Sequence, residues 1–140
     1  MTWITTSGVT VPEDIALCAG LGVDAVGLVV DFPGKVPWGV RLDEAEVLLA
    51  GLPAGVERVV VVGDDPDLVL RITRRLAPDI VHLHAVPLPA PTRQTGSPAP
   101  SSAASSLHMD RLVRMLHDHD VRVMGTLRLR AADGTVATPT

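Results

Sequence analysis

Short apolar runs rich in Val, Leu and Ile alternate along the chain with segments whose apolar residues recur every three or four positions. Four runs have the length of buried strands and span residues 24–30, 57–62, 79–84 and 121–127, and a weaker run spans 3–6. Val, Leu and Ala supply most of the hydrophobic content, and only two Trp and one Phe are aromatic. The core is therefore expected to be aliphatic, as in buried parallel strands with helices packed on them.

The segments between these runs predict helices. Pro12, Asp43 and Pro66 mark helix starts, because each is followed by an acidic residue and then by apolar residues at helical spacing. Proline and acids in a first turn suit the free N–H groups and the positive dipole end of a helix. A fourth helix is expected at about 107–119. Alternation of strand and helix predicts right-handed crossovers and a parallel sheet.

The length predicts one domain, residues 1–130, interrupted by an insertion. Residues 86–106 contain five prolines and five serines and almost nothing that a core could bury, so we expect a flexible insertion there. The small and polar residues 131–140 are expected to form a disordered tail. The segment 10–26 resembles 64–81, two strand–helix units later, which favours a barrel built from duplicated units.

Charge and cysteine content exclude several classes of protein. The net charge is −4 and no basic run is present, which argues against binding to nucleic acid or to an anionic membrane surface. Cys18 is the single cysteine and cannot form an internal disulfide. The sequence shows neither a secretion signal nor an apolar segment long enough to span a bilayer, so we expect a cytoplasmic protein.

Five sequence segments, taken in order, resemble the phosphoribosylanthranilate isomerase family. Residues 7–14 read Ser-Gly-Val-Thr-Val-Pro-Glu-Asp, where the family reads Cys-Gly-Ile-Thr-Arg-Pro-Glu-Asp. Residues 22–29 resemble its second strand, and 31–40 resemble the loop that carries Ser-Pro-Arg-Tyr-Val. Residues 81–85 read Val-His-Leu-His-Ala, similar to Val-Gln-Leu-His-Gly, and 121–128 resemble the fifth strand.

This resemblance covers about residues 3–130 and implies a partial TIM (β/α) barrel of about five parallel strands with helices between them. A complete barrel has about 250 residues. Five strands cannot close as eight do, so the first and fifth strands are expected to present open edges. Three outcomes are open. The chain is a shortened or fragmentary product, or it pairs with itself or with a complementary barrel half, or it forms an open sheet with helices on both faces.

The resemblance also implies a site, and the chain departs from the family there. The family's general base is a cysteine where this chain has Ser7, whose hydroxyl is a weak base near neutral pH. The arginine that would hold the anthranilate carboxylate aligns with Trp38, which cannot form a bidentate ion pair. The family's catalytic acid on strand six and its phosphate-binding loops after strands seven and eight are expected to be absent.

The remaining candidate residues are His82, His84 and Arg128, which we assign to substrate binding. The two histidines lie two apart on a strand, so they face one side, and at its carboxyl end they point toward a barrel mouth. The alternative is that they make ordinary hydrogen bonds as a family signature. Since the sequence places no third ligand beside them, we expect no metal site, and we expect no cofactor. Arg128 would bind an anion if it turned inward.

Two functions stay open from the sequence. The first is a phosphoribosylanthranilate isomerase-like protein of tryptophan biosynthesis, an intramolecular isomerase by resemblance, with a phosphosugar-type ligand. We expect it to be truncated and to behave as a pseudoenzyme when isolated, because the acid–base groups of an Amadori rearrangement are altered or missing. The second is a non-catalytic small-molecule-binding or assembly module that retains the half-barrel. A homo-oligomer or a complementary barrel half is the expected partner.

Overall fold

The computed structural model describes residues 2–34, 36–84, 100–125, 129–130 and 136–137. Its main sheet runs in the order β1-β2-β4-β5-β6, and every pairing in it is parallel. These strands are β1 (Thr5–Ser7), β2 (Ala25–Val30), β4 (Glu57–Val62), β5 (Ile80–Leu83) and β6 (Arg122–Gly125). Because neighbours in the sheet follow one another along the chain, each connection is a simple crossover that carries a helix.

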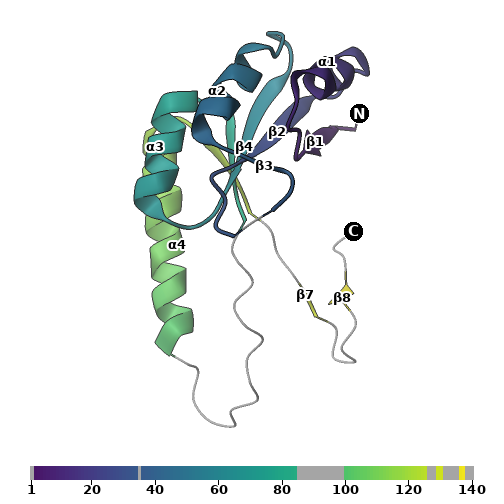
Figure 1. Ribbon diagram of the computed structural model, residues 1–140. Coiled ribbons are helices and arrows are strands. Elements are labelled where there is room, and N and C mark those ends of the chain that lie inside the picture. Colours follow the sequence, from purple (N-terminus) through teal and green to yellow (C-terminus); the bar gives the residue numbers. More distant parts are fainter. Residues whose placement is uncertain (1, 35, 85–99, 126–128, 131–135, 138–140) are drawn as a thin grey trace.

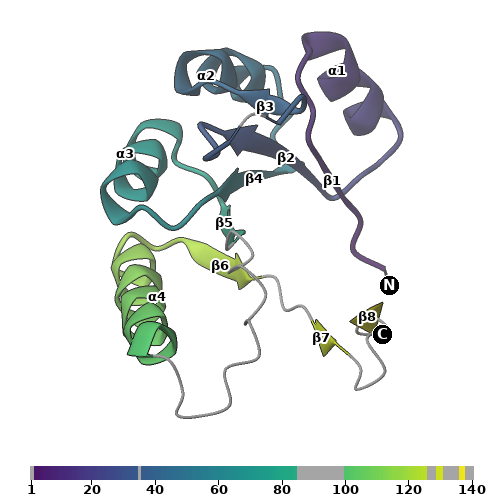
Figure 2. The same cartoon turned by 60° about the horizontal axis from the view of Figure 1, so that its bottom comes forward.

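The helices all lie on the outer side of a curved sheet, as Figure 1 and Figure 2 show from two directions. They are α1 (Pro12–Gly20), α2 (Leu42–Ala50), α3 (Pro66–Leu76) and α4 (Pro100–Asp118). Helices on one face only are the arrangement of a (β/α) barrel, whereas a doubly wound sheet carries them on both faces. The predicted partial barrel is therefore confirmed, and the alternative of an open doubly wound sheet is wrong.

The two faces of the sheet bury different sets of side chains. The larger core lies between the sheet and the helices and includes Val26, Leu28 and Val60. A smaller cluster lies on the opposite face, the inner side of the partial barrel, and consists of Ala25, Val59 and Ile80 with Met124 packed against them. Successive residues of a strand point to opposite faces, so β2, β4 and β5 each contribute to both clusters. This explains why the runs are apolar throughout rather than alternating.

The two copies of the internal repeat, residues 10–26 and 64–81, each contain an aspartate that makes the same kind of hydrogen bond. The Asp24 carboxylate accepts a hydrogen bond of 2.7 Å from the backbone N–H of Ile4, just before β1. The Asp79 carboxylate accepts one of 2.8 Å from the N–H of Arg58, at the start of β4. In both units, an aspartate just before one strand thus accepts a hydrogen bond from the amino end of the preceding strand, which is its neighbour in the sheet.

Helix starts follow the predicted chemistry. Proline occupies the first turn of α1 and of α3. At α3 the Asp65 side chain accepts hydrogen bonds from the N–H groups of Asp67 and Leu68, at 3.1 and 3.3 Å. The acidic run before α3 is thus an N-cap, which stabilises a helix by satisfying free N–H groups. No helix in the described ranges is long and apolar enough to cross a membrane.

Three features differ from the sequence-based expectation. The two-residue strand β3 (Gly39–Val40) pairs with the end of β2 and lies within the loop between β2 and α2. Helix α4 begins at Pro100, earlier than the predicted start at about 107. Two short antiparallel strands, β7 (Leu129–Arg130) and β8 (Val136–Ala137), form a separate small sheet. Two-residue pairings carry too little hydrophobic pattern to be predicted from sequence.

Candidate ligand-binding site

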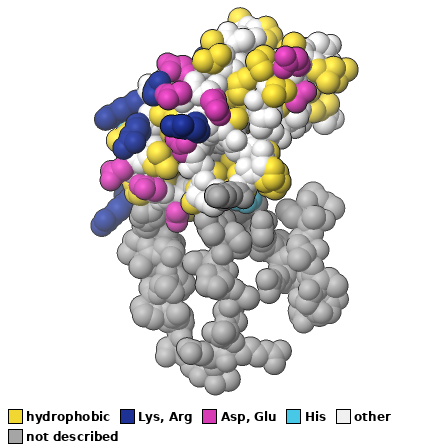
Figure 3. Space-filling model, viewed as in Figure 1, with side chains coloured by type: hydrophobic (Ala, Val, Ile, Leu, Met, Phe, Trp, Pro, Cys, Tyr) yellow, Lys and Arg dark blue, Asp and Glu magenta, His cyan; other side chains and the backbone are white. Residues whose placement is uncertain are grey.

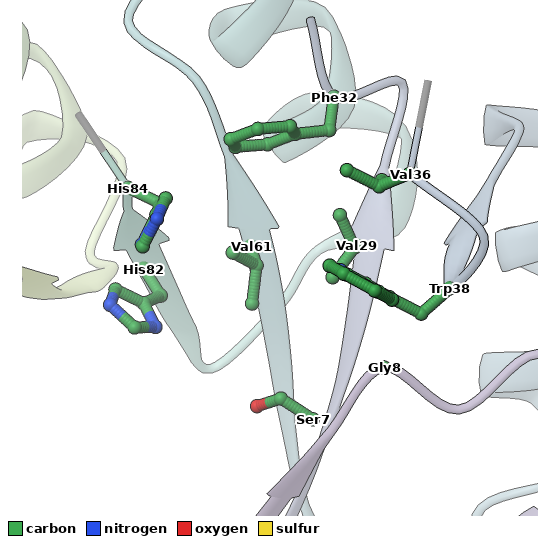
Figure 4. A pocket seen from close by; sticks show the side chains of 9 residues that line it. All are labelled: Ser7, Gly8, Val29, Phe32, Val36, Trp38, Val61, His82 and His84. Carbon is green, nitrogen blue, oxygen red and sulfur yellow. The ribbon is translucent and has the colours of Figure 1, made fainter. Parts of the chain in front are cut away.

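A pocket of about 530 Å³ opens at the carboxyl ends of β1, β2, β4 and β5 (Figure 4). The loop that follows β2, described at residues 31–34 and 36–38 and called the 31–38 loop, covers one side of it. Its lining is Ser7, Gly8, Val29, Phe32, Val36, Trp38, Val61, His82 and His84. The carboxyl end is where ligands bind in (β/α) barrels, and the volume is in the range of small-molecule sites, about 300–1,000 Å³.

Strand register brings the polar groups together. Ser7 pairs with Gly27 across β1 and β2, and Val61 pairs with His82 across β4 and β5. Gly27 and Val61 lie on the same inner face of the sheet, two register positions apart. His84 follows His82 by two residues and shares its side. The prediction that both imidazoles point toward the barrel mouth is in agreement with their place in the lining.

Gly27 leaves the space that the Ser7 hydroxyl occupies. A Cβ at position 27 would lie 2.7 Å from Ser7 Oγ, closer than a Cβ atom approaches other atoms in proteins, and 3.3 Å from Ser7 Cβ. The glycine is required here by the close approach of a neighbouring side chain, and its φ is not in the left-handed region. The Gly27 carbonyl also accepts a 3.0 Å hydrogen bond from Gly8 N, which holds the chain where β1 ends.

Two further glycines set the position of the 31–38 loop. A Cβ at Gly63, just after β4, would lie 2.9 Å from ring atoms of Pro33, so the loop crosses this point only because the side chain is missing. A Cβ at Gly8 would lie 3.4 Å from Trp38 Cβ, and Gly8 has a φ of +90°. Hydrogen bonding of Asp31 N to Val40 O, at 3.0 Å, closes the base of the loop.

The aromatic rings around the pocket contact one another. The Phe32 and His84 ring centroids are 5.7 Å apart with planes tilted by 55°. The His82 and His84 centroids are 6.0 Å apart in an edge-to-face arrangement. Such geometries let the edge of one ring meet the electron-rich face of another. Trp38 lies at the mouth with half of its surface exposed.

The surroundings of His82 favour the neutral form of its imidazole. Burial lowers the pKa of the half-buried His82 below 6.5, and the electrostatic interaction with His84 lowers it further. Near pH 7 its imidazole therefore carries one N–H donor and one acceptor nitrogen rather than a charge. Within the described part of the chain, no group of three His, Cys, Asp or Glu residues could hold a metal ion.

The structure thus gathers Ser7, His82 and His84 in one site, and it adds residues that sequence analysis missed. Arg128 lies outside the described residues. Phe32 and Val36 were not predicted as lining, and Trp38 was noted only as a departure from the family motif. Their contribution depends on how the 31–38 loop folds back over β4. The signals in the sequence were Gly27, within the strand β2, and Gly63, directly after β4.

Sequence comparison confirms the resemblance to phosphoribosylanthranilate isomerases. The chain is 35% identical over 85 residues to N-(5'-phosphoribosyl)anthranilate isomerase of Halobacterium salinarum, a match that covers 60% of this chain and 39% of that protein. The chain thus spans about two fifths of the length of the curated relatives that it matches. No protein-family model matches the sequence.

Solved structures share the fold. Phosphoribosyl anthranilate isomerase from Thermococcus kodakaraensis matches 91% of this chain with half of its own, at a TM-score of 0.64 and 16% identity. A phosphoribosyl anthranilate isomerase in complex with reduced 1-(o-carboxyphenylamino)-1-deoxyribulose 5-phosphate matches 91% of this chain and 77% of its own, with a TM-score of 0.56 and 19% identity. At these identities the likeness establishes the partial-barrel fold.

Proposed function

We propose that this chain is a phosphoribosylanthranilate isomerase-like protein of the tryptophan-biosynthesis type. Its pocket binds a small organic molecule, and the isolated chain does not catalyse the Amadori rearrangement. One observation carries the proposal: Ser7 and Trp38 both line the pocket at the positions where the family motifs have the general base and the carboxylate-binding arginine. The scaffold of the site is retained while its two characteristic side chains are replaced.

The replacements remove what the reaction needs. An aldose–ketose rearrangement requires a proton donor and a proton acceptor held on opposite sides of an anchored substrate. A serine hydroxyl does not ionise near neutral pH, and an indole cannot form the ion pair that would anchor a carboxylate. His82 is a neutral imidazole in the same pocket, but it stands where the family motif has glutamine. Its presence favours hydrogen bonding to a ligand over the family's own chemistry.

An assay of phosphoribosylanthranilate turnover tests the catalytic half of this proposal. The purified chain is expected to give no conversion above the uncatalysed rate, at concentrations where a full-length family enzyme is saturated. Growth of a tryptophan auxotroph on this chain alone would contradict the proposal, and so would turnover abolished by Ser7→Ala. Either result would favour the alternative, a relative that catalyses the isomerisation with altered residues.

A specific observation also favours an assembly role. Large apolar side chains are exposed near β1, namely Trp3 and Ile4 before the strand, Leu17 on α1 and Leu21 directly after α1. Figure 3 shows hydrophobic side chains gathered over this part of the molecule. Exposed apolar patches on otherwise polar surfaces are typical of interaction sites. We therefore retain a second copy or a complementary barrel half as the partner that covers the open edge.

A further inference from the structure

The pocket has an apolar side and a polar side. Val29 and Val61 from the sheet meet Phe32, Val36 and Trp38 from the 31–38 loop on its apolar side. The polar side consists of Ser7, His82 and His84, so the described lining contains neither a lysine nor an arginine. A ligand in this site therefore meets hydrogen-bonding groups on one side and aromatic and aliphatic groups on the other.

This lining is unfavourable for an anion. A carboxylate that enters an apolar pocket loses its hydration, and it is stabilised only if a cation or several donors replace the water. The position that would supply the cation in the family holds Trp38, and burial lowers the pKa of His82, which favours its neutral imidazole. The described lining residues thus offer dipoles, and a dipole stabilises a full charge by little compared with the hydration that the charge loses.

The same lining is favourable for a planar ring. The half-exposed Trp38 lines the pocket, and the ring centroids of Phe32 and His84 are 5.7 Å apart with tilted planes. Aromatic side chains in such arrangements bind a further ring by stacking or by edge-to-face contact. The pocket volume of about 530 Å³ accommodates one ring and its substituents.

We propose that this pocket selects an uncharged aromatic molecule with hydrogen-bonding substituents, and that it discriminates against the same ring carrying a carboxylate. The inference rests on the proposed function, because it assigns a ligand class to that same site. The Ser7 hydroxyl and the two imidazoles then bind the ring substituents, and Trp38 covers the ring. On this proposal, Trp38 at the position of the family's arginine changes which ligands the pocket binds, and is more than the loss of a carboxylate-binding group.

The test uses two probes of nearly the same shape, 2-aminobenzamide, which is neutral, and 2-aminobenzoate, which carries a carboxylate. Binding is followed at pH 7.5 by isothermal titration calorimetry in every variant, and also by NMR in the proteins that retain Trp38, because Trp3 and Trp38 give the only two indole N–H signals of the chain. The unaltered protein is expected to bind the amide about tenfold or more tightly than the carboxylate, with the Trp38 signal shifted. Trp38→Arg should reverse this preference, because a guanidinium pairs with a carboxylate.

Two variants serve as controls. Trp38→Leu should weaken binding of the amide without loss of folding, since 52% of this side chain is exposed. Trp3→Leu removes the other tryptophan, which is 43% exposed and does not line the pocket, and should leave binding of the amide unchanged.

The outcomes separate the inference from the proposed function. Equal or tighter binding of 2-aminobenzoate by the unaltered chain, with the Trp38 signal shifted, overturns the charge selectivity and leaves the pocket as a binding site. Failure of both probes to shift the Trp38 signal at millimolar concentration overturns the ligand class. Isomerase turnover, measured separately, would overturn the proposed function whichever probe binds.

Discussion

In the pocket, the position of the Ser7 hydroxyl depends on the absence of a side chain at Gly27. Ser7 extends over Gly27 because the two residues are in register on neighbouring strands, and the space for Oγ exists only while position 27 has no Cβ. Beside them His82 is held neutral by burial and by its histidine neighbour. Each of these residues is ordinary in the sequence, and its chemical role comes from its immediate neighbours.

Gly27→Ala tests the dependence of Ser7 on its neighbour. The added methyl group would lie 2.7 Å from Ser7 Oγ, so the hydroxyl must rotate away or β1 must shift. We expect several-fold weaker binding of 2-aminobenzamide and a loss of stability of about 1–3 kcal/mol, as for other overpacked sites. Gly20→Ala is the matched control, because nothing lies within 4 Å of its Cβ position. Equal effects of the two substitutions on binding would show that Ser7 is not held by Gly27.

His82 predicts how stability depends on pH. Its folded-state pKa is lowered, so the unfolded chain binds a proton at a higher pH than the folded protein does. The free energy of unfolding is therefore expected to rise with pH between the folded-state pKa and about 6.5 and to fall as the solution is acidified through that window.

Thermal unfolding at a series of pH values between 5 and 8 measures this effect, and an NMR titration gives the His82 midpoint directly. His82→Gln should flatten the pH dependence in this window, whereas the exposed His119 provides a control substitution, His119→Gln. An NMR midpoint at or above 6.5 would contradict the lowered pKa.

Among the elements, the 31–38 loop decides the shape of the site. It is closed at its base by the two-residue strand β3 and rests on Gly63 at the end of β4. Three lining residues, Phe32, Val36 and Trp38, come from this one segment. The strands provide the polar groups, and the loop provides most of the apolar surface.

Gly63→Ala should displace this loop without disturbing the strands. The new Cβ would lie 2.9 Å from Pro33 Cγ and Cδ, and a proline ring has little freedom to move aside. We expect a shifted Trp38 indole signal and loss of probe binding, with a stability loss of about 1–3 kcal/mol. Gly55→Ala, which meets nothing within 4 Å, controls for the glycine substitution itself. A crystal structure of the variant with an unmoved loop would refute this role of Gly63.

On the scale of the whole molecule, the curved sheet leaves β1 and β6 as the ends of its strand order. Unpaired strand edges are templates for further pairing, and the apolar surface beside β1 adds to this tendency. Additional strands at an edge would extend the sheet and cover more of the inner face of the partial barrel. The open sheet thus predicts association.

Leu17→Glu combined with Leu21→Glu tests this surface. Light scattering of the unaltered chain over a range of concentrations should show assembly, and the double variant should shift it toward the monomer, because two charges would be buried at the contact. Both leucines are largely exposed, so folding should be preserved. Val47→Glu places a charge on an exposed apolar position of α2 away from that edge and should leave assembly unchanged. A monomer at every concentration of the unaltered chain would contradict the prediction.

The sequence alone determined the order and direction of the main elements. Strand β4 was predicted with its observed bounds, 57–62, and Pro12 and Pro66 marked helix starts that the structure confirms. These features depend on local patterns, namely runs of β-branched residues and the chemistry of free N–H groups, so they can be read without neighbours. The order of family-like segments likewise pointed to a partial barrel.

Tertiary structure alone decided how the site is built. The Ser7 and Gly27 contact joins residues twenty positions apart, and the position of Trp38 over Gly8 depends on how the 31–38 loop crosses the end of β4. Such contacts arise from sheet register and loop packing, and they leave no periodic signal in the chain. The placement of all four helices on one face was decided in the same way, by the curvature of the assembled sheet.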